Sequence, residues 1–105
     1  MRALSVSTVS IMVLLAIMTA AVSQTLPAAE EGARLAAMWC SSCHATGATS
    51  QGADIGPTFV EIAQRRSPDY LRGFLANPHV RGSMPPFDLA REHTEDLVAY
   101  FQSLK

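Results

Sequence analysis

Three residues whose types and spacing could carry chemistry lie close together: Cys40, Cys43 and His44, within the pentapeptide CSSCH. Two cysteines three positions apart, followed at once by histidine, are the usual attachment motif of a c-type haem. Each thiol can add to one of the two vinyl groups at the same edge of a porphyrin, and the next residue then lies under the ring, where its imidazole can reach the iron. The motif therefore predicts one covalent haem c, attached through Cys40 and Cys43, with His44 as a metal ligand.

Three other interpretations of the two cysteines compete with haem attachment. A thioredoxin-like redox motif would follow a strand in a βαβ unit, and the sequence around Cys40 has no such pattern. A zinc site would need a second pair of ligands, but the other histidines, His79 and His93, show no recognisable ligand spacing. A disulfide between Cys40 and Cys43 would suit an oxidising compartment, but it would leave His44 unexplained. The pentapeptide favours haem attachment over these three.

A haem iron with one imidazole ligand needs either a sixth ligand or an open site. Beyond the apolar N-terminal segment the chain has two methionines, Met38 and Met84. Met38 precedes Cys40 by two residues in a helical segment, and we expect it in the hydrophobic core. Met84 lies in the segment GSMPPF, a loop with little core to fill, so its thioether is favoured as the second metal ligand over a gap-filling role. The rival ligand is His79, which we expect instead to face solvent or bond within its loop.

The chain opens with the features of a secretory signal. Arg2 supplies a positive charge, residues 9–22 are mainly apolar, and small residues follow. The apolar run is shorter than the ~20 residues that a spanning helix needs, so cleavage is favoured over a retained anchor. We expect residues 1–23 to be a cleaved signal peptide, 24–30 a flexible lead-in and 31–105 the functional domain, with no membrane span after cleavage.

Charge and size restrict the function further. The whole chain has eight basic and nine acidic side chains, a net charge of −1, and loss of the signal removes one basic residue and leaves −2. This balance is too mild to indicate binding to nucleic acid or to an anionic membrane surface. A domain of this size buries only a modest core, and a covalent haem would add a large apolar surface at its centre.

The domain is predicted to be all-α, because no alternating strand pattern and no repeat is visible. Ser67 and Pro68 are typical of a helix start, and Leu97, Phe101 and Leu104 share one face of the last helix. The four segments with helical patterns are residues 31–39, 58–66, 68–77 and 90–104.

Over nearly all of residues 30–105 the sequence resembles the class I monohaem cytochromes c, of the small secreted bacterial type. The resemblance is carried by CSSCH after a helix, by Gly56-Pro57 some dozen residues later, by the Met84 loop and by a last helix reading DLVAYFQSL. It implies the cytochrome c fold, about four helices wrapped around one covalent haem. It also implies that His44 is the proximal ligand, that Met84 is the distal ligand, and that the carbonyl of Pro57 accepts a hydrogen bond from the other nitrogen of His44.

Further expectations concern residues near this site. Arg65 and Arg66 are the basic candidates for binding the haem propionates, although a solvated charge pair at a helix end fits the sequence equally well. His93 is expected on the exposed face of the last helix. The resemblance implies that Gly32 lets the first helix cross the last closely, against Tyr100.

The resemblance implies a one-electron carrier with His/Met ligation, and not an enzyme. It would pass electrons between transiently bound redox proteins in the periplasm, after export across the inner membrane. We expect a monomer or a subunit of a redox complex. The alternatives are a cytochrome subunit of a dehydrogenase or oxidase, and a haem sensor or enzyme with an open sixth position.

Overall fold

The computed structural model describes residues 27–77 and 82–105. In these ranges there is no strand, and none of the helices is long and apolar enough to cross a membrane. The predicted signal peptide and His79 lie outside the described residues. The all-α prediction is confirmed. The described residues form four helices, α2 (Ala28–Trp39), α3 (Phe59–Arg65), α4 (Pro68–Leu75) and α5 (Arg91–Ser103).

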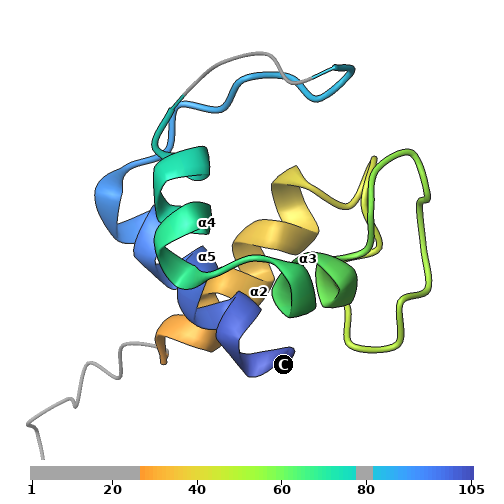
Figure 1. Ribbon diagram of the computed structural model, residues 1–105, viewed down its shortest axis with the longest axis horizontal. Coiled ribbons are helices and arrows are strands. Elements are labelled where there is room, and N and C mark those ends of the chain that lie inside the picture. Colours follow the sequence, from red (N-terminus) through yellow and green to blue (C-terminus); the bar gives the residue numbers. More distant parts are fainter. Residues whose placement is uncertain (1–26, 78–81) are drawn as a thin grey trace, which may run out of the picture.

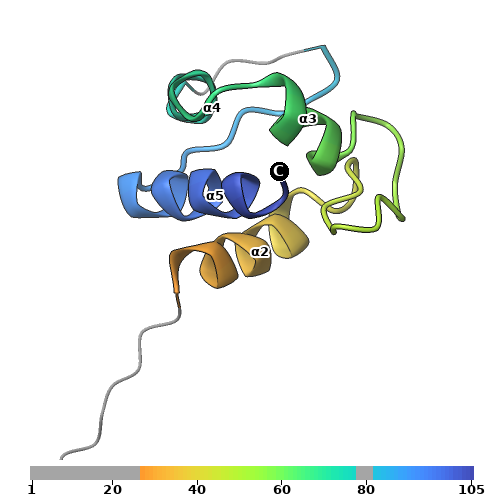
Figure 2. The same cartoon turned by 60° about the horizontal axis from the view of Figure 1, so that its bottom comes forward.

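Helix α5 is the centre of the arrangement, because it contacts each of the other three described helices. In Figure 1 the chain runs from α2 through a long loop to α3 and α4, and then returns to α5. Figure 2 shows α2 and α5 packed side by side, with α3 and α4 on the opposite side of α5 from α2.

The crossing of α2 and α5 depends on Gly32. A Cβ atom on this residue would lie 2.0 Å from the carbonyl oxygen of Asp96 and 2.7 Å from Cβ of Tyr100. Both distances are far below van der Waals contact, so only glycine lets the two helices approach this closely. The close crossing expected at Gly32 and Tyr100 is confirmed.

The core lies where these helices meet, and it follows the predicted helical faces. The ring of Phe59 stacks on that of Phe101, with 4.5 Å between ring centroids. Leu97 and Phe101 are buried one turn apart on α5, and Leu104 packs partly buried against the same cluster. The buried members of the core are Leu35, Ala36, Phe59, Ala63, Leu71, Leu97, Val98 and Phe101.

Local capping fixes where α3 and α4 begin. The Thr58 hydroxyl accepts a hydrogen bond from the backbone N–H of Glu61, whose carboxylate in turn accepts from the N–H of Thr58, forming a complete capping box. The Ser67 hydroxyl accepts from the N–H of Tyr70 at 3.1 Å, as its predicted role at the helix start requires. In contrast, Ala90 offers no side-chain cap to α5.

Two expectations about α2 are wrong. The helix begins at Ala28, so its first turn lies within the segment expected to be a flexible lead-in, and the carbonyl of Pro27 accepts a hydrogen bond from the N–H of Glu31. Met38 is 55% exposed and does not belong to the core. The reason is geometric: α5 covers the face of α2 that carries Leu35, which leaves Met38 on the outer face.

Candidate functional site

A cavity of about 500 Å³ opens between the α3–α4 pair and α5, within the range of pockets that hold small molecules and cofactors. Its walls are mainly apolar. The structure brings Cys40, Cys43, His44, Pro57 and Met84 to this one cavity, so every site residue predicted from the sequence lines it.

The imidazole of His44 is held in one orientation by the loop that follows α2. Its Nδ1 atom lies 2.6 Å from the carbonyl oxygen of Pro57. Because a carbonyl can only accept a hydrogen bond, Nδ1 must carry the proton, and in the neutral ring Nε2 then keeps its lone pair. The hydrogen bond expected between His44 and Pro57 is present, and it leaves Nε2 available to a metal.

Two neighbours restrict the same ring further. A Cβ atom on Gly56 would lie 2.4 Å from Cε1 of His44, so the backbone passes directly against the imidazole. The ring of Phe59 meets His44 edge-on, with 5.4 Å between ring centroids. The loop is closed beside the ring by a backbone hydrogen bond of 2.8 Å from Gly56 to the carbonyl of Cys43. These contacts explain why the sequence has glycine immediately before Pro57.

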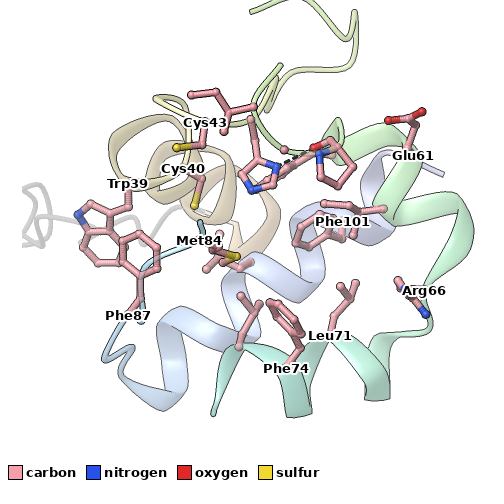
Figure 3. A pocket seen from close by; sticks show the side chains of 18 of the residues that line it. Trp39, Cys40, Cys43, Glu61, Arg66, Leu71, Phe74, Met84, Phe87 and Phe101 are labelled. Atoms are coloured by element: carbon pink, nitrogen blue, oxygen red, sulfur yellow. Dashed lines mark hydrogen bonds between the residues drawn. The ribbon is translucent and has the colours of Figure 1, made fainter. Parts of the chain in front are cut away.

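Cys40 and Cys43 lie on the same side of the cavity, at the C-terminal end of α2 (Figure 3). Both are free thiols. Burial raises the pKa of Cys40 to about 11, and the nearby Cys43 contributes to the shift. At neutral pH Cys40 is therefore a neutral thiol, which adds no charge to the apolar wall.

Met84 reaches the cavity from the loop between α4 and α5. Its side chain is half-buried. Figure 3 shows it with Cys40 on one side and with Leu71 and Phe74 of α4 on the other. The structure thus brings a thioether to the same cavity as the imidazole of His44, forty positions earlier in the chain.

Sequence reasoning missed an aromatic wall formed by Trp39 and Phe87. Both residues line the cavity, and Figure 3 draws them on the same side of it. Trp39 also meets the ring of His93 edge-on, with 5.6 Å between centroids. The expectation that His93 lies on an exposed face is therefore wrong, since it is partly buried against Trp39. The only available signal was an aromatic residue directly before CSSCH and another after the prolines.

Charged residues lie at one part of the cavity lining. Arg65, Arg66 and Glu61 all contribute to it, and the two arginines are also exposed to solvent. The guanidinium carbon of Arg66 lies 4.4 Å from the centroid of the Tyr70 ring, a cation–π contact.

The residues present fit a covalent haem. A haem c needs two thiols beside each other, an imidazole nitrogen with a free lone pair, and an apolar cavity. Cys40, Cys43 and His44 supply these groups, and Met84 offers a sulfur ligand from the opposite chain segment.

Comparison with known proteins gives two matches. Residues 27–101 match the model of a family described as cytochrome C oxidase, cbb3-type, subunit III. The chain is also 39% identical over 101 residues to a protein named cytochrome c-552 from Bradyrhizobium diazoefficiens, a match that covers 90% of this chain and 92% of the relative. No solved structure matches the chain significantly.

Proposed function

The chain belongs to the family of cbb3-type oxidase subunit III, a family of c-type cytochromes, and we propose that His44 and Met84 ligate the iron of its haem c. Cytochromes c are electron-transfer proteins, so the chain is an electron carrier and not an enzyme. In this proposal Cys40 and Cys43 form the two thioether bonds.

The observation that carries the proposal is the convergence of four side chains on one cavity. Two of them, Cys40 and Cys43, are thiols at the end of α2, the third is the His44 imidazole, and the fourth is the Met84 thioether. The first three lie within five consecutive residues, but Met84 reaches the cavity only because α3 and α4 pack against α5.

The protein would contribute orientation and exclusion of water. The hydrogen bond from Nδ1 of His44 to Pro57 fixes the ring and raises the basicity of Nε2. Apolar residues such as Leu71, Phe74 and Phe101 keep water from the cavity walls. When bound, haem c supplies an iron that takes up and releases one electron. A thioether ligand from Met84 would favour the reduced state and block access to small molecules.

The spectrum of the ferric protein tests the ligand set, and the two methionines of the mature chain provide a matched pair. Met84→Ala should abolish the weak sulfur-to-iron charge-transfer band near the red end of the visible spectrum, and it should lower the reduction potential. Met38→Ala, which removes an exposed thioether outside the cavity, should change neither. If Met84→Ala left the band and the potential intact, Met84 would not be the ligand, and His79→Ala would be the next variant to examine.

The domain boundaries and the periplasmic location also belong to this proposal. They are supported by the signal-like pattern of residues 1–23 and by the match that begins at residue 27. Expression in a host that attaches haem c to exported proteins, followed by osmotic release and mass spectrometry, should give a chain that starts at Gln24. A chain that kept its N-terminus and stayed with the membrane fraction would contradict cleavage.

The family description favours a second role, as a cytochrome subunit of an oxidase complex. The redox partners would then bind permanently, whereas a free carrier docks only weakly. Mild detergent extraction followed by gel filtration separates the roles: a free carrier elutes alone, and a subunit elutes with haem-containing partners. A high-spin ferric spectrum would instead favour a sensor or enzyme with an open sixth position.

A further inference from the structure

The further inference concerns the end of the cavity that lies away from the two cysteines. It rests on the proposed haem attachment. A haem has its two vinyl groups at one edge and two propionate carboxylates at the opposite edge. If Cys40 and Cys43 hold the vinyl edge, the carboxylates must lie toward the far side of the cavity. Figure 3 shows Arg66 on that side, away from both cysteines.

The charges at this end favour an anion. Arg65 and Arg66 are the cationic side chains among the described lining residues, and Glu61 is the acidic one. The Glu61 carboxylate accepts hydrogen bonds from the backbone N–H and the hydroxyl of Thr58, so it serves the cap of α3. The balance of charge is therefore positive here, although the whole chain is slightly negative.

Arg66 differs from the arginines that stabilise the helices. Arg34 pairs with Glu31 on α2, and Arg72 of α4 bonds to carboxylates on both α4 and α5. Within the part of the chain that the structure describes, Arg66 forms no salt bridge. Its charge is thus not neutralised by a described carboxylate of the protein.

An aromatic ring holds Arg66 in place instead. The guanidinium lies over the ring of Tyr70, four residues later on α4. Tyr70 stacks in turn on Phe74, with 6.1 Å between centroids, and Phe74 lines the cavity. Tyr70 is 45% exposed. The Tyr70 ring is uncharged, so its cation–π contact orients the Arg66 guanidinium without neutralising its charge.

We propose that Arg66 binds the propionate carboxylates of the haem and that Tyr70 is the residue that positions it. A guanidinium matches a carboxylate in geometry and can donate two hydrogen bonds to it. Its positive charge also stabilises the ferrous state relative to the ferric state, because reduction removes one positive charge from the iron. Arg66 therefore raises the reduction potential.

The test compares Arg66→Gln with Arg91→Gln in the haem-loaded protein by spectroelectrochemical titration. Both changes remove one positive charge, but Arg91 does not line the cavity. Arg66→Gln should shift the equilibrium with a one-electron reference couple toward the oxidised protein by about threefold or more, where tenfold corresponds to 59 mV. Arg91→Gln should shift it much less, and Arg66→Lys should recover part of the loss.

A second pair of variants tests the role of the ring. Tyr70→Phe keeps the aromatic face and should keep the wild-type potential, whereas Tyr70→Leu should lower the potential in the direction of Arg66→Gln. A purely structural role for Tyr70 would lower the urea midpoint of unfolding without moving the potential.

The outcomes separate this proposal from the one on which it rests. If Arg66→Gln and Arg91→Gln had equal potentials, with low-spin spectra like that of the wild type, the role of Arg66 would be refuted while the ligand set stood. If Arg66→Gln failed to fold, Arg66→Lys and the Tyr70 pair would decide in the same titration. A wild-type protein without a c-type haem spectrum would overturn both proposals.

Discussion

Replacement of Gly32 by alanine should lower the free energy of unfolding if packing against α5 dominates, and raise it if helix propensity dominates. In an isolated helix, Gly→Ala stabilises by about 1 kcal/mol. At Gly32, however, the new Cβ would lie 2.0 Å from the carbonyl oxygen of Asp96 and 2.6 Å from its carbonyl carbon, whereas ordinary contacts begin near 3.4 Å. These are backbone atoms of α5, so no side-chain rotation relieves the overlap, and α2 and α5 must move apart.

The magnitude follows from what that movement disrupts. Overpacking of a well-packed site usually costs about 1–3 kcal/mol, and this overlap involves two backbone atoms of one helix. Separation would also loosen the contacts of Leu35 and Leu97, both almost fully buried. After the gain in propensity, we expect a net destabilisation of about 2 kcal/mol, or roughly 10 °C in Tm for a domain of this size.

Gly73→Ala is the matched control. Gly73 lies within α4, and apart from its chain neighbours and the backbone of its own helix no atom lies within 4 Å of the position its Cβ would take. Propensity acts alone there, so this variant should be more stable than the wild type by up to about 1 kcal/mol. Urea unfolding of both ferric proteins, followed by circular dichroism, gives the two differences. The reasoning about the crossing would be refuted if Gly32→Ala were as stable as Gly73→Ala.

Three further predictions concern contacts outside the cavity. Thr58→Ala removes the capping box of α3 and should lower the free energy of unfolding by about 1 kcal/mol in urea titrations. Tyr100→Phe removes the hydrogen bond from its hydroxyl to the carbonyl of Thr46 and should also lose about 1 kcal/mol, seen as a lower Tm. Hydrogen bonding and charge from Arg72 lower the pKa of Glu95, so this pair stabilises the protein above the unfolded pKa of about 4.3 and less as pH falls through the lower folded value. Arg72→Gln should therefore flatten the decline in urea midpoint below about pH 4.5.

Controls for these three variants use neighbouring residues or conditions. Ser67→Ala should resemble Thr58→Ala in size, because it removes the cap of α4. Thr46→Ala should leave the effect of Tyr100→Phe unchanged, because the acceptor is a backbone carbonyl. The pH effect of Arg72→Gln should shrink in high salt, since the ion pair is solvent-exposed, and an effect that salt did not alter would contradict an electrostatic origin.

Features that depend on neighbouring residues could be predicted from the sequence. The attachment motif places Cys40, Cys43 and His44 within one turn of chain, so their spacing alone predicts their chemistry. The start of α4 was predictable because it depends on residues close together in the sequence: the Ser67 hydroxyl caps the N–H of Tyr70, and Pro68 takes the first helical position. The buried face of α5 was predictable because Leu97 and Phe101 lie one helical turn apart.

Predictions failed where they depended on which surface a neighbouring helix covers. Met38 is apolar and helical, but its exposure is decided by the line along which α5 crosses α2. His93 was expected to face solvent, but the contact with Trp39 arises only because the end of α2 approaches α5. Composition and periodicity describe one helix at a time and contain no information about such a crossing.

The sequence by itself showed the CSSCH motif, and the family that the chain matches, a family of c-type cytochromes, implies a covalent haem c. Only the tertiary structure decided that Met84 and Arg66 line the same cavity as His44. The physical reason is chain separation: residues within one turn are held together by covalent geometry. Residues tens of positions apart meet only when burial of apolar surface packs α3 and α4 against α5.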